Sequence, residues 1–283
     1  MAENRQGYSP GVEMRDLDFE RISRLVYDLA GINLHDGKKE LVKSRLGKRL
    51  RHGNFGSFSD YYRYVTTQAG ADELIAMIDS LSTNLTYFFR EEKHYKKLEE
   101  VVREMAKEQS QRTTTLRLRV WSAGCSTGEE PYTLALVLNE ALTGRAGNIT
   151  ILATDISTRA LKKAVTGIYE KERVNTISPP LLRKYFQLGQ GRWQGHYRVK
   201  KNIREMISFK RFNLKETLDA DYCFDFIFCR NVMIYFDKRT QEEVVNRFYD
   251  RLHEGGYLFI GHSESLTGLS HRFTYVQPSI YRK

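Results

Sequence analysis

The chain has 283 residues, of which 41% are hydrophobic and 12% aromatic, so it is neither disordered nor fibrous and is long enough for two domains. Its 45 basic and 35 acidic residues give a net charge of +10, which predicts an acidic partner such as nucleic acid, a membrane surface or an acidic protein. No apolar run reaches the roughly 18 residues of a membrane span, and the N-terminus lacks the pattern of a secretion signal. Three scattered cysteines fit reduced thiols rather than a zinc site. We therefore expect a cytoplasmic protein with no membrane insertion and no metal.

The first third of the chain predicts helices only. Residues 1–12 are expected to be a flexible tail, and 13–90 an all-α domain. Apolar residues recur at helical spacing over 16–31, and Gly31 is suited to end that helix. Helical patterns follow at 37–53, 57–67 and 71–83, with Ser57 and Ser59 as candidate caps.

The helix at 38–51 is strongly basic. Its apolar residues are Leu41, Val42, Leu46 and Leu50. Its other face carries Lys38, Lys39, Lys43, Arg45, Lys48, Arg49 and Arg51. A charge run is usually just a solvated face, but an excess of one sign favours docking of an acidic partner. Nucleic acid fits the sign, although no aromatic stacking platform accompanies the helix.

Residues 83–109 begin with polar side chains set among aromatic ones. Asn84, Thr86 and Arg90 surround the aromatic run at 87–89, and a linker helix is expected over 91–115. This start could simply pack its aromatic rings with Arg90 exposed. Alternatively, the forked guanidinium of Arg90 lies beside a hydrophobic pocket, where it could orient a carboxylate.

From residue 116 onward, strands and helices alternate, which predicts a doubly wound α/β domain over 116–283. A strand over 116–123 ends at Gly124, and Glu129, Glu130 and Pro131 open the next helix. The loop between them belongs to neither phosphate-binding pattern: acids replace the Lys of a Walker loop, and Ser126 replaces the second Gly of GxGxxG. It favours a ligand with positive charge or hydroxyl groups, although an ordinary strand-to-helix turn remains open.

Three further strand ends carry polar residues. The second strand ends at Asp155, where an acid typically binds ribose hydroxyls, although a helix cap near Ser157 is the alternative. A glycine-rich turn and alternating residues predict a small antiparallel insertion at 188–210, leading into a strand that ends at Asn213 and Leu214.

The next buried strand, at 224–229, is followed by Arg230, Asn231 and Tyr235. A helix over 241–256 closed by Gly255 and Gly256, a strand at 257–265 and a final strand at 273–283 complete the pattern.

Six motifs together carry a specific resemblance. In chain order they are TNLTYFFRE, SAGCSTGEEPY, ATDIS, RFNL, FCRNVMIYFDK and GHSES. Each is weak alone, but in this order they resemble the CheR-type chemotaxis receptor methyltransferases over essentially the whole chain. The resemblance implies a Rossmann-like class I methyltransferase domain with a small β-subdomain, preceded by an all-α domain. It also implies an enzyme at receptor arrays that transfers methyl groups from S-adenosylmethionine to receptor glutamates, giving methyl esters and S-adenosylhomocysteine, for sensory adaptation.

The resemblance also implies roles for matching residues. Arg90 and Tyr235 would be catalytic. The cofactor would be held by Asn84, Thr86, Arg90, Glu129, Asp155, Asn213, Leu214, Arg230 and Asn231. Among these, Glu129 would approach the cofactor's ammonium, Asp155 its ribose, and Asn213 and Leu214 its adenine. Cys125 receives no role.

The implied partner is the acidic helical bundle of a chemotaxis receptor, bound through the basic helix 38–51, with a receptor C-terminal peptide as a candidate ligand of the β-subdomain. Two alternatives are a nucleic-acid methyltransferase and a non-catalytic module that senses the cofactor. Nucleic acid is not expected, because Val232 and Met233 follow Asn231 where amino-directed enzymes have two prolines and an aromatic residue.

Overall fold

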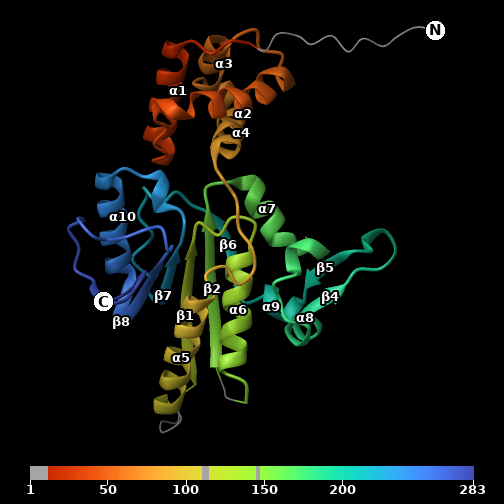
Figure 1. Cartoon of the computed structure of the whole chain (residues 1–283), viewed down its shortest axis with the longest axis vertical. Coiled ribbons are helices and arrows are strands. Elements are labelled where there is room, and N and C mark those ends of the chain that lie inside the picture. The colour runs from red at the N-terminus through yellow and green to blue at the C-terminus, as the bar shows by residue number, and fades with distance from the viewer. Residues whose placement is uncertain (1–11, 110–114, 145–146) are drawn as a thin grey trace. The chain divides into compact units, whose positions relative to one another are not determined.

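The computed structural model describes residues 12–109, 115–144 and 147–283. These residues form two compact units that divide between Thr83 and Asn84 (Figure 1). Residues 1–11 of the expected tail and 110–114 of the expected linker helix lie outside the described residues.

The N-terminal unit is helical, as the sequence predicts. Its helices are α1 (Asp16–Ala30), α2 (Lys39–His52), α3 (Phe58–Val65) and α4 (Ala71–Leu81), with 3-10 turns at Asp36–Lys38 and Gln68–Gly70. Each α-helix buries one apolar face, and Gly31 ends α1 in the left-handed conformation with φ 72°.

Two details of this unit differ from expectation. Ser57 caps α3 by accepting a hydrogen bond from the Asp60 N–H, whereas Ser59 lies inside the helix. Leu41 is 39% exposed, because successive helix residues point about 100° apart and its neighbour Val42 takes the buried position.

The second unit is built on a seven-stranded sheet in the order β6-β2-β1-β7-β8-β10-β9. The first five strands are parallel, and β10 and β9 are antiparallel. The strands are β1 (Leu116–Ala123), β2 (Gly147–Asp155), β6 (Ile207–Arg211), β7 (Phe224–Cys229), β8 (Leu252–Ile260), β9 (Thr274–Gln277) and β10 (Ile280–Arg282). The single final strand expected at 273–283 is therefore a hairpin.

Helices cover both faces of this sheet, which confirms the doubly wound prediction (Figure 1). The helices are α5 (Glu92–Gln109), α6 (Glu129–Ala141), α7 (Thr158–Thr166) and α10 (Lys238–Arg251). Alternation along β1 sends Leu118 and Val120 into the core shared with α5 and α6, and Trp121 and Ala123 into the core shared with α10.

The predicted end of the last helix at Gly255 and Gly256 is wrong. α10 stops at Arg251, and β8 begins directly at Leu252, which pairs with Phe224 of β7. Pairing with a buried central strand therefore overrides the glycine signal. No helix in the described part of the chain is both long and apolar enough to cross a bilayer.

A second, three-stranded antiparallel sheet has the order β3-β5-β4. It consists of β3 (Ile168–Glu170), β4 (Phe186–Leu188) and β5 (His196–Val199), with α8 (Pro179–Tyr185) and α9 (Lys201–Arg204) around it and 3-10 turns at Lys171–Val174 and Gly191–Trp193. The insertion expected at 188–210 overlaps this sheet without coinciding with it: the sheet already begins at Ile168, and 207–211 form β6 of the main sheet.

Candidate functional site

The loop between β1 and α6 is tied to the end of β2. The backbone N–H groups of Gly124 and Cys125 both donate to the Thr154 carbonyl, at 2.8 Å each. Gly124 has φ +87°, and a Cβ there would lie 2.4 Å from Val232 Cγ2, so a larger residue does not fit. The loop thus lies at the carboxyl end of the parallel strands, where α/β proteins bind ligands.

Asp155 organises this edge of the sheet. Its side chain is nearly buried, with Oδ2 accepting a 2.8 Å hydrogen bond from the Ser126 N–H and Oδ1 accepting one of 2.8 Å from the Ser157 N–H. The cap of α7 itself is Ser157, so the cap alternative and a ligand-binding role for Asp155 are compatible. The Phe212 N–H donates to the Asp155 carbonyl at 3.1 Å and brings 212–214 alongside.

The segment 84–91 is anchored to the same loop and is not helical. Ser126 Oγ donates to the Asn84 carbonyl at 3.1 Å, and the Phe89 N–H donates to Thr133 Oγ1 at 3.3 Å. Arg90 is partly exposed; its Nη1 donates to the Leu85 carbonyl at 3.0 Å, and its guanidinium carbon lies 5.8 Å from the Tyr87 ring centroid. Thr86 is buried beside them.

Arg230 is the buried centre of a charge network. Its side chain is 1% exposed. Its Nη1 donates to Tyr95 Oη at 2.8 Å and lies 3.4 Å from Glu130 Oε2, its Nε donates to Glu91 Oε2 at 3.1 Å, and its Nη2 donates to the Arg90 carbonyl. The Arg230 side chain therefore fixes the 90–91 backbone to β7.

The pKa values of this network reflect burial and mutual charge. Burial opposes the charge of Arg230, but Tyr95, Glu130 and Glu91 outweigh it and raise its pKa. Burial raises the pKa of Tyr95 to about 12, and it raises the pKa of Glu130 against the opposing effect of Arg230. His94 lies at the edge of the network, where burial and the nearby Arg230 charge lower its pKa to about 3.

Glu129 forms an ion pair with Arg173, a residue that the sequence analysis missed. Its carboxylate is fully buried; one oxygen accepts a 2.6 Å hydrogen bond from Thr127 Oγ1 and the other pairs with Arg173 Nη2. Arg173 lies in the 3-10 turn before α8, within a polar stretch that carries no motif, so no sequence signal identified it.

Glu264 is a second missed residue. Its carboxylate accepts hydrogen bonds from the N–H groups of Asn231 (2.9 Å), Val232 (3.0 Å), Ile234 (3.2 Å) and Gly261 (2.6 Å). Burial raises its pKa although these donors oppose the shift. Its place in the GHSES motif, directly after a buried strand, was the available signal.

The loop that Glu264 holds carries Asn231 and Tyr235. Asn231 adopts φ 59°, and its buried Oδ1 has no hydrogen-bond partner. Tyr235 ends the 3-10 turn Met233–Tyr235 and is partly exposed. A buried acceptor without a partner is costly unless a ligand or water satisfies it, so this position is a candidate ligand contact.

Backbone strain gathers in the same segments. Among the described residues, six other than glycine have positive φ, and four of them are Phe89, Glu91, Ser126 and Asn231. Such conformations cost energy and cluster at functional sites. Phe89 and Glu91 flank Arg90, so the backbone conformation that presents Arg90 is itself strained.

The Cys125 thiol lies inside the loop and donates a weak hydrogen bond to the Ser126 carbonyl, at 3.8 Å. Cys125 and Cys229 are buried, and burial raises the pKa of both well above the usual value. Cys223 is partly exposed. A buried protonated thiol is a poor nucleophile, so Cys125 shapes the loop by packing.

The structure thus joins most of the predicted site residues through hydrogen bonds. Segments 84–91, 124–128, 155–157, 212–214 and 230–235 lie along the ends of β1, β2, β6 and β7. Arg230 and Glu129 are the predicted residues held in buried ion pairs, Arg230 with Glu91 and Glu130 and Glu129 with Arg173. A ligand that contacts Arg230 or Glu129 would therefore have to share that side chain with its ion-pair partner.

Two family models match the chain. The CheR methyltransferase all-alpha domain matches residues 17–82, and the CheR methyltransferase SAM binding domain matches residues 84–282. Together they meet at the boundary between the two compact units.

Curated relatives agree over nearly the full length. The chain is 38% identical to a chemotaxis protein methyltransferase of Borreliella burgdorferi over 100% of both chains. It is 42% identical to that of Klebsiella aerogenes over 95% of this chain and 90% of the relative. For the Escherichia coli protein the identity is 40%, over 95% and 91%. The chain therefore belongs to the CheR family of chemotaxis protein methyltransferases and carries that family's S-adenosylmethionine-binding domain.

Proposed function

We propose that this enzyme methylates glutamate side chains of chemotaxis receptors, giving glutamyl methyl esters and S-adenosylhomocysteine for sensory adaptation, in the cytoplasm at receptor arrays. The observation that carries the proposal is the joined set of strand ends, in which a nearly buried Asp155 and a buried, unpartnered Asn231 Oδ1 belong to the same edge of the sheet. Both are acceptors, as a ligand rich in hydroxyl and ammonium groups requires.

The cofactor assignments follow from that edge. Each Asp155 oxygen accepts a backbone N–H, and a carboxylate in this position would accept ribose hydroxyls. Residues Asn213 and Leu214 would flank the adenine. Glu129 would hold the ammonium while sharing its charge with Arg173, and Asn231 Oδ1 would accept a further hydrogen bond. Asn84 and Thr86 would border the methionine end.

When bound, the cofactor supplies an electrophilic methyl group on a sulfonium. A glutamate is already a carboxylate at neutral pH, because its pKa is near 4.3, so the protein needs no general base and the transfer as written needs no metal. The task of the chain is alignment and exclusion of water. Arg90, held by its own strained segment, would orient the incoming carboxylate, and Tyr235 would assist by donating a hydrogen bond.

Arg90 must orient the incoming carboxylate without binding it too strongly. The attacking anion and the sulfonium neutralise each other during transfer, so a cation that stabilised the carboxylate strongly would slow the step. The partial exposure of Arg90 fits a modest interaction, since water weakens its charge.

The basic helix remains the proposed docking surface, but three of its basic side chains have partners within the N-terminal unit. Lys39 pairs with Asp16, Arg45 donates to the Leu81 and Ser82 carbonyls, and Arg49 pairs with Glu73. These three side chains hold the unit together. The acidic receptor bundle would therefore meet the remaining basic side chains, which are Lys38, Lys43, Lys48 and Arg51. The small sheet would take a receptor C-terminal peptide.

The decisive experiment supplies labelled S-adenosylmethionine to receptor-containing membranes. Transfer to protein with base-labile label supports the proposal, because carboxyl esters hydrolyse in base. Stable label in RNA would support the nucleic-acid alternative instead. Binding of cofactor by calorimetry without any transfer would support the non-catalytic module.

Arg90→Ala tests the catalytic assignment. We expect turnover to fall by about 10- to 100-fold, in the range of a lost positioning group, while cofactor affinity falls less. Arg90→Lys should keep only part of the wild-type turnover, because an ammonium lacks the planar fork of a guanidinium. Wild-type turnover together with wild-type cofactor affinity in Arg90→Ala would show that the assignment is wrong.

A further inference from the structure

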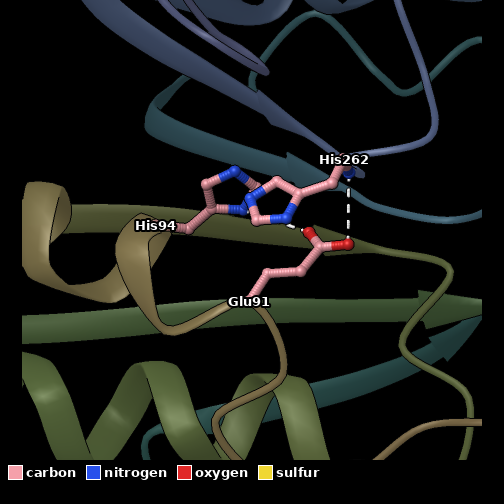
Figure 2. A group of neighbouring side chains, drawn as sticks. All are labelled: Glu91, His94 and His262. Carbon is pink, nitrogen blue, oxygen red and sulfur yellow. Dashed lines mark hydrogen bonds and ion pairs between the residues drawn. The ribbon is translucent and has the colours of Figure 1, made fainter.

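Three metal-ligating side chains converge beside the Arg230 network, outside the residues assigned to cofactor or substrate. They are Glu91, His94 and His262, and Figure 2 shows their polar ends turned toward one another. One ligand atom from each lies within 4.8 Å of the others. Glu91 and His94 border the start of α5, whereas His262 follows β8, so two distant parts of the chain meet here.

His94 is the observation that points to a ligand. Its residue is 1% exposed, and neither of its ring nitrogens has a hydrogen-bond partner. Nδ1 lies 3.4 Å from Glu91 Oε2, an ion-pair distance that is long for a hydrogen bond. Buried polar atoms normally have a hydrogen-bond partner, so the two ring nitrogens of His94 are available to bind a ligand.

The surroundings position the other two ligands. Glu91 Oε1 accepts a 3.1 Å hydrogen bond from the His262 backbone N–H, which joins the loop after β8 to the start of α5. The ring centroids of His94 and His262 are 4.8 Å apart, and the two rings meet edge to face. His262 is exposed, so its side chain is free to turn and shorten the distances to those of a metal site.

We propose that Glu91, His94 and His262 bind a late first-row divalent metal ion such as Zn²⁺. Two imidazoles and one carboxylate form a donor set that Zn²⁺ accepts, with Zn–N bonds of about 2.0–2.1 Å and a fourth position left for water. A bound ion would satisfy the buried ring of His94 and would cross-link the start of α5 to the loop after β8.

Nearby charges set the strength of this site. Arg230 shares Glu91 and repels a cation, whereas the carboxylates of Glu91 and Glu130 attract it. Because one guanidinium offsets one of the two carboxylates, binding is weaker than at a closed structural zinc site with several thiolates. Metal binding can be tested without measuring the proposed methyl transfer.

Co²⁺ titration of the untagged full-length protein tests the site, since Co²⁺ reports its ligands by visible absorption. Wild type should take up one Co²⁺ with ligand-field bands and without thiolate charge-transfer absorption, and Zn²⁺ should displace it. His262→Gln, an exposed change, should weaken binding at least tenfold. The matched control His253→Gln alters another exposed histidine and should bind as wild type does.

Two outcomes would overturn the proposal. One is the absence of stoichiometric Co²⁺ uptake by wild type. The other is equal affinity in wild type and His262→Gln, which would place any bound ion elsewhere. Circular dichroism of both variants confirms that the fold is retained, so a loss of binding cannot be ascribed to unfolding.

Discussion

The two units place their basic side chains differently. In the N-terminal unit, Asp18 and Asp79 are buried acids, but the basic side chains that the structure describes lie at or near the surface and hold helices together, as when Arg45 donates to the last carbonyls of α4. In the methyltransferase unit, Arg230, Glu129 and Asp155 are almost fully buried. Exposed charges interact weakly and are replaceable, whereas a buried charge persists only where its partners are supplied. Burial of basic charge therefore distinguishes the surface proposed for docking from the site proposed for methyl transfer.

Arg230→Met should have the largest effect. It leaves Glu91 and Glu130 buried without their cation, and breaking a buried pair in this way costs about 3–5 kcal/mol. Urea unfolding of the full chain measures this cost. The matched variant Arg63→Met breaks a surface pair with Asp60 and should change stability by about 0.5 kcal/mol or less. Equal costs for the two variants would erase the contrast between the units.

Asp155→Ala should weaken the cofactor site next. The change removes the acceptor of the Ser126 and Ser157 N–H groups as well as the proposed ribose contact. A loss of about 1–3 kcal/mol, or roughly 5- to 150-fold in affinity for S-adenosylhomocysteine, is expected by calorimetry. Asp155→Asn keeps one acceptor oxygen, so its affinity for S-adenosylhomocysteine should lie between those of wild type and Asp155→Ala. Exposed Asp219→Ala is the control, and matching affinities for Asp155→Ala and the control would contradict the assignment.

Charge reversal on α2 should give a smaller effect that depends on salt. Lys43→Glu combined with Lys48→Glu changes one partly exposed and one exposed side chain outside the cofactor-binding domain, so cofactor binding should stay at wild type while receptor methylation falls several-fold at low salt. Screening shortens the range of the interaction to about 10 Å at 0.1 M salt, so added salt should narrow the difference. Arg24→Glu on α1 is the control. A defect of equal size in that variant would argue against α2 as the docking surface.

The smallest predicted effect is on acid stability. Burial alone would raise the pKa of Glu73, but hydrogen bonds from Arg49 and Tyr61 lower it below its usual value. A lowered folded pKa stabilises the protein above the unfolded value, about 4.3, and that contribution is lost as pH falls through the folded pKa. The stability gap between wild type and Glu73→Gln should therefore shrink on acidification. A gap that stays constant in urea unfolding down to about pH 3 would contradict this.

Local patterns predicted most of the fold because each pattern has one direct physical cause. Amphipathic spacing located α1 to α4, and a continuous apolar run located the parallel strand β7. The errors lie where distant pairing decides. Leu252 joins β8 because Phe224 lies beside it, and β3 pairs with β5 across a long stretch of sequence. Neither pairing leaves a local signal.

The candidate site was predictable to the extent that its residues follow strands. Asp155, Asn213 and Asn231 all do, and the ends of parallel strands meet at one edge of a sheet. Arg173 was missed because it lies in a 3-10 turn without a motif, and Glu264 was missed because its position after β8 does not show which groups it binds. Their roles depend on tertiary contacts with Glu129 and with the loop after β7.

The burial of two of the three thiols has a practical consequence for labelling. Cys223 alone is accessible in the native state, so a maleimide dye should attach at one defined position just before β7 without mutagenesis. Cys125 and Cys229 would become reactive only as the sheet opens. Counting dyes per molecule during denaturation would then follow the opening of the cofactor-binding unit directly.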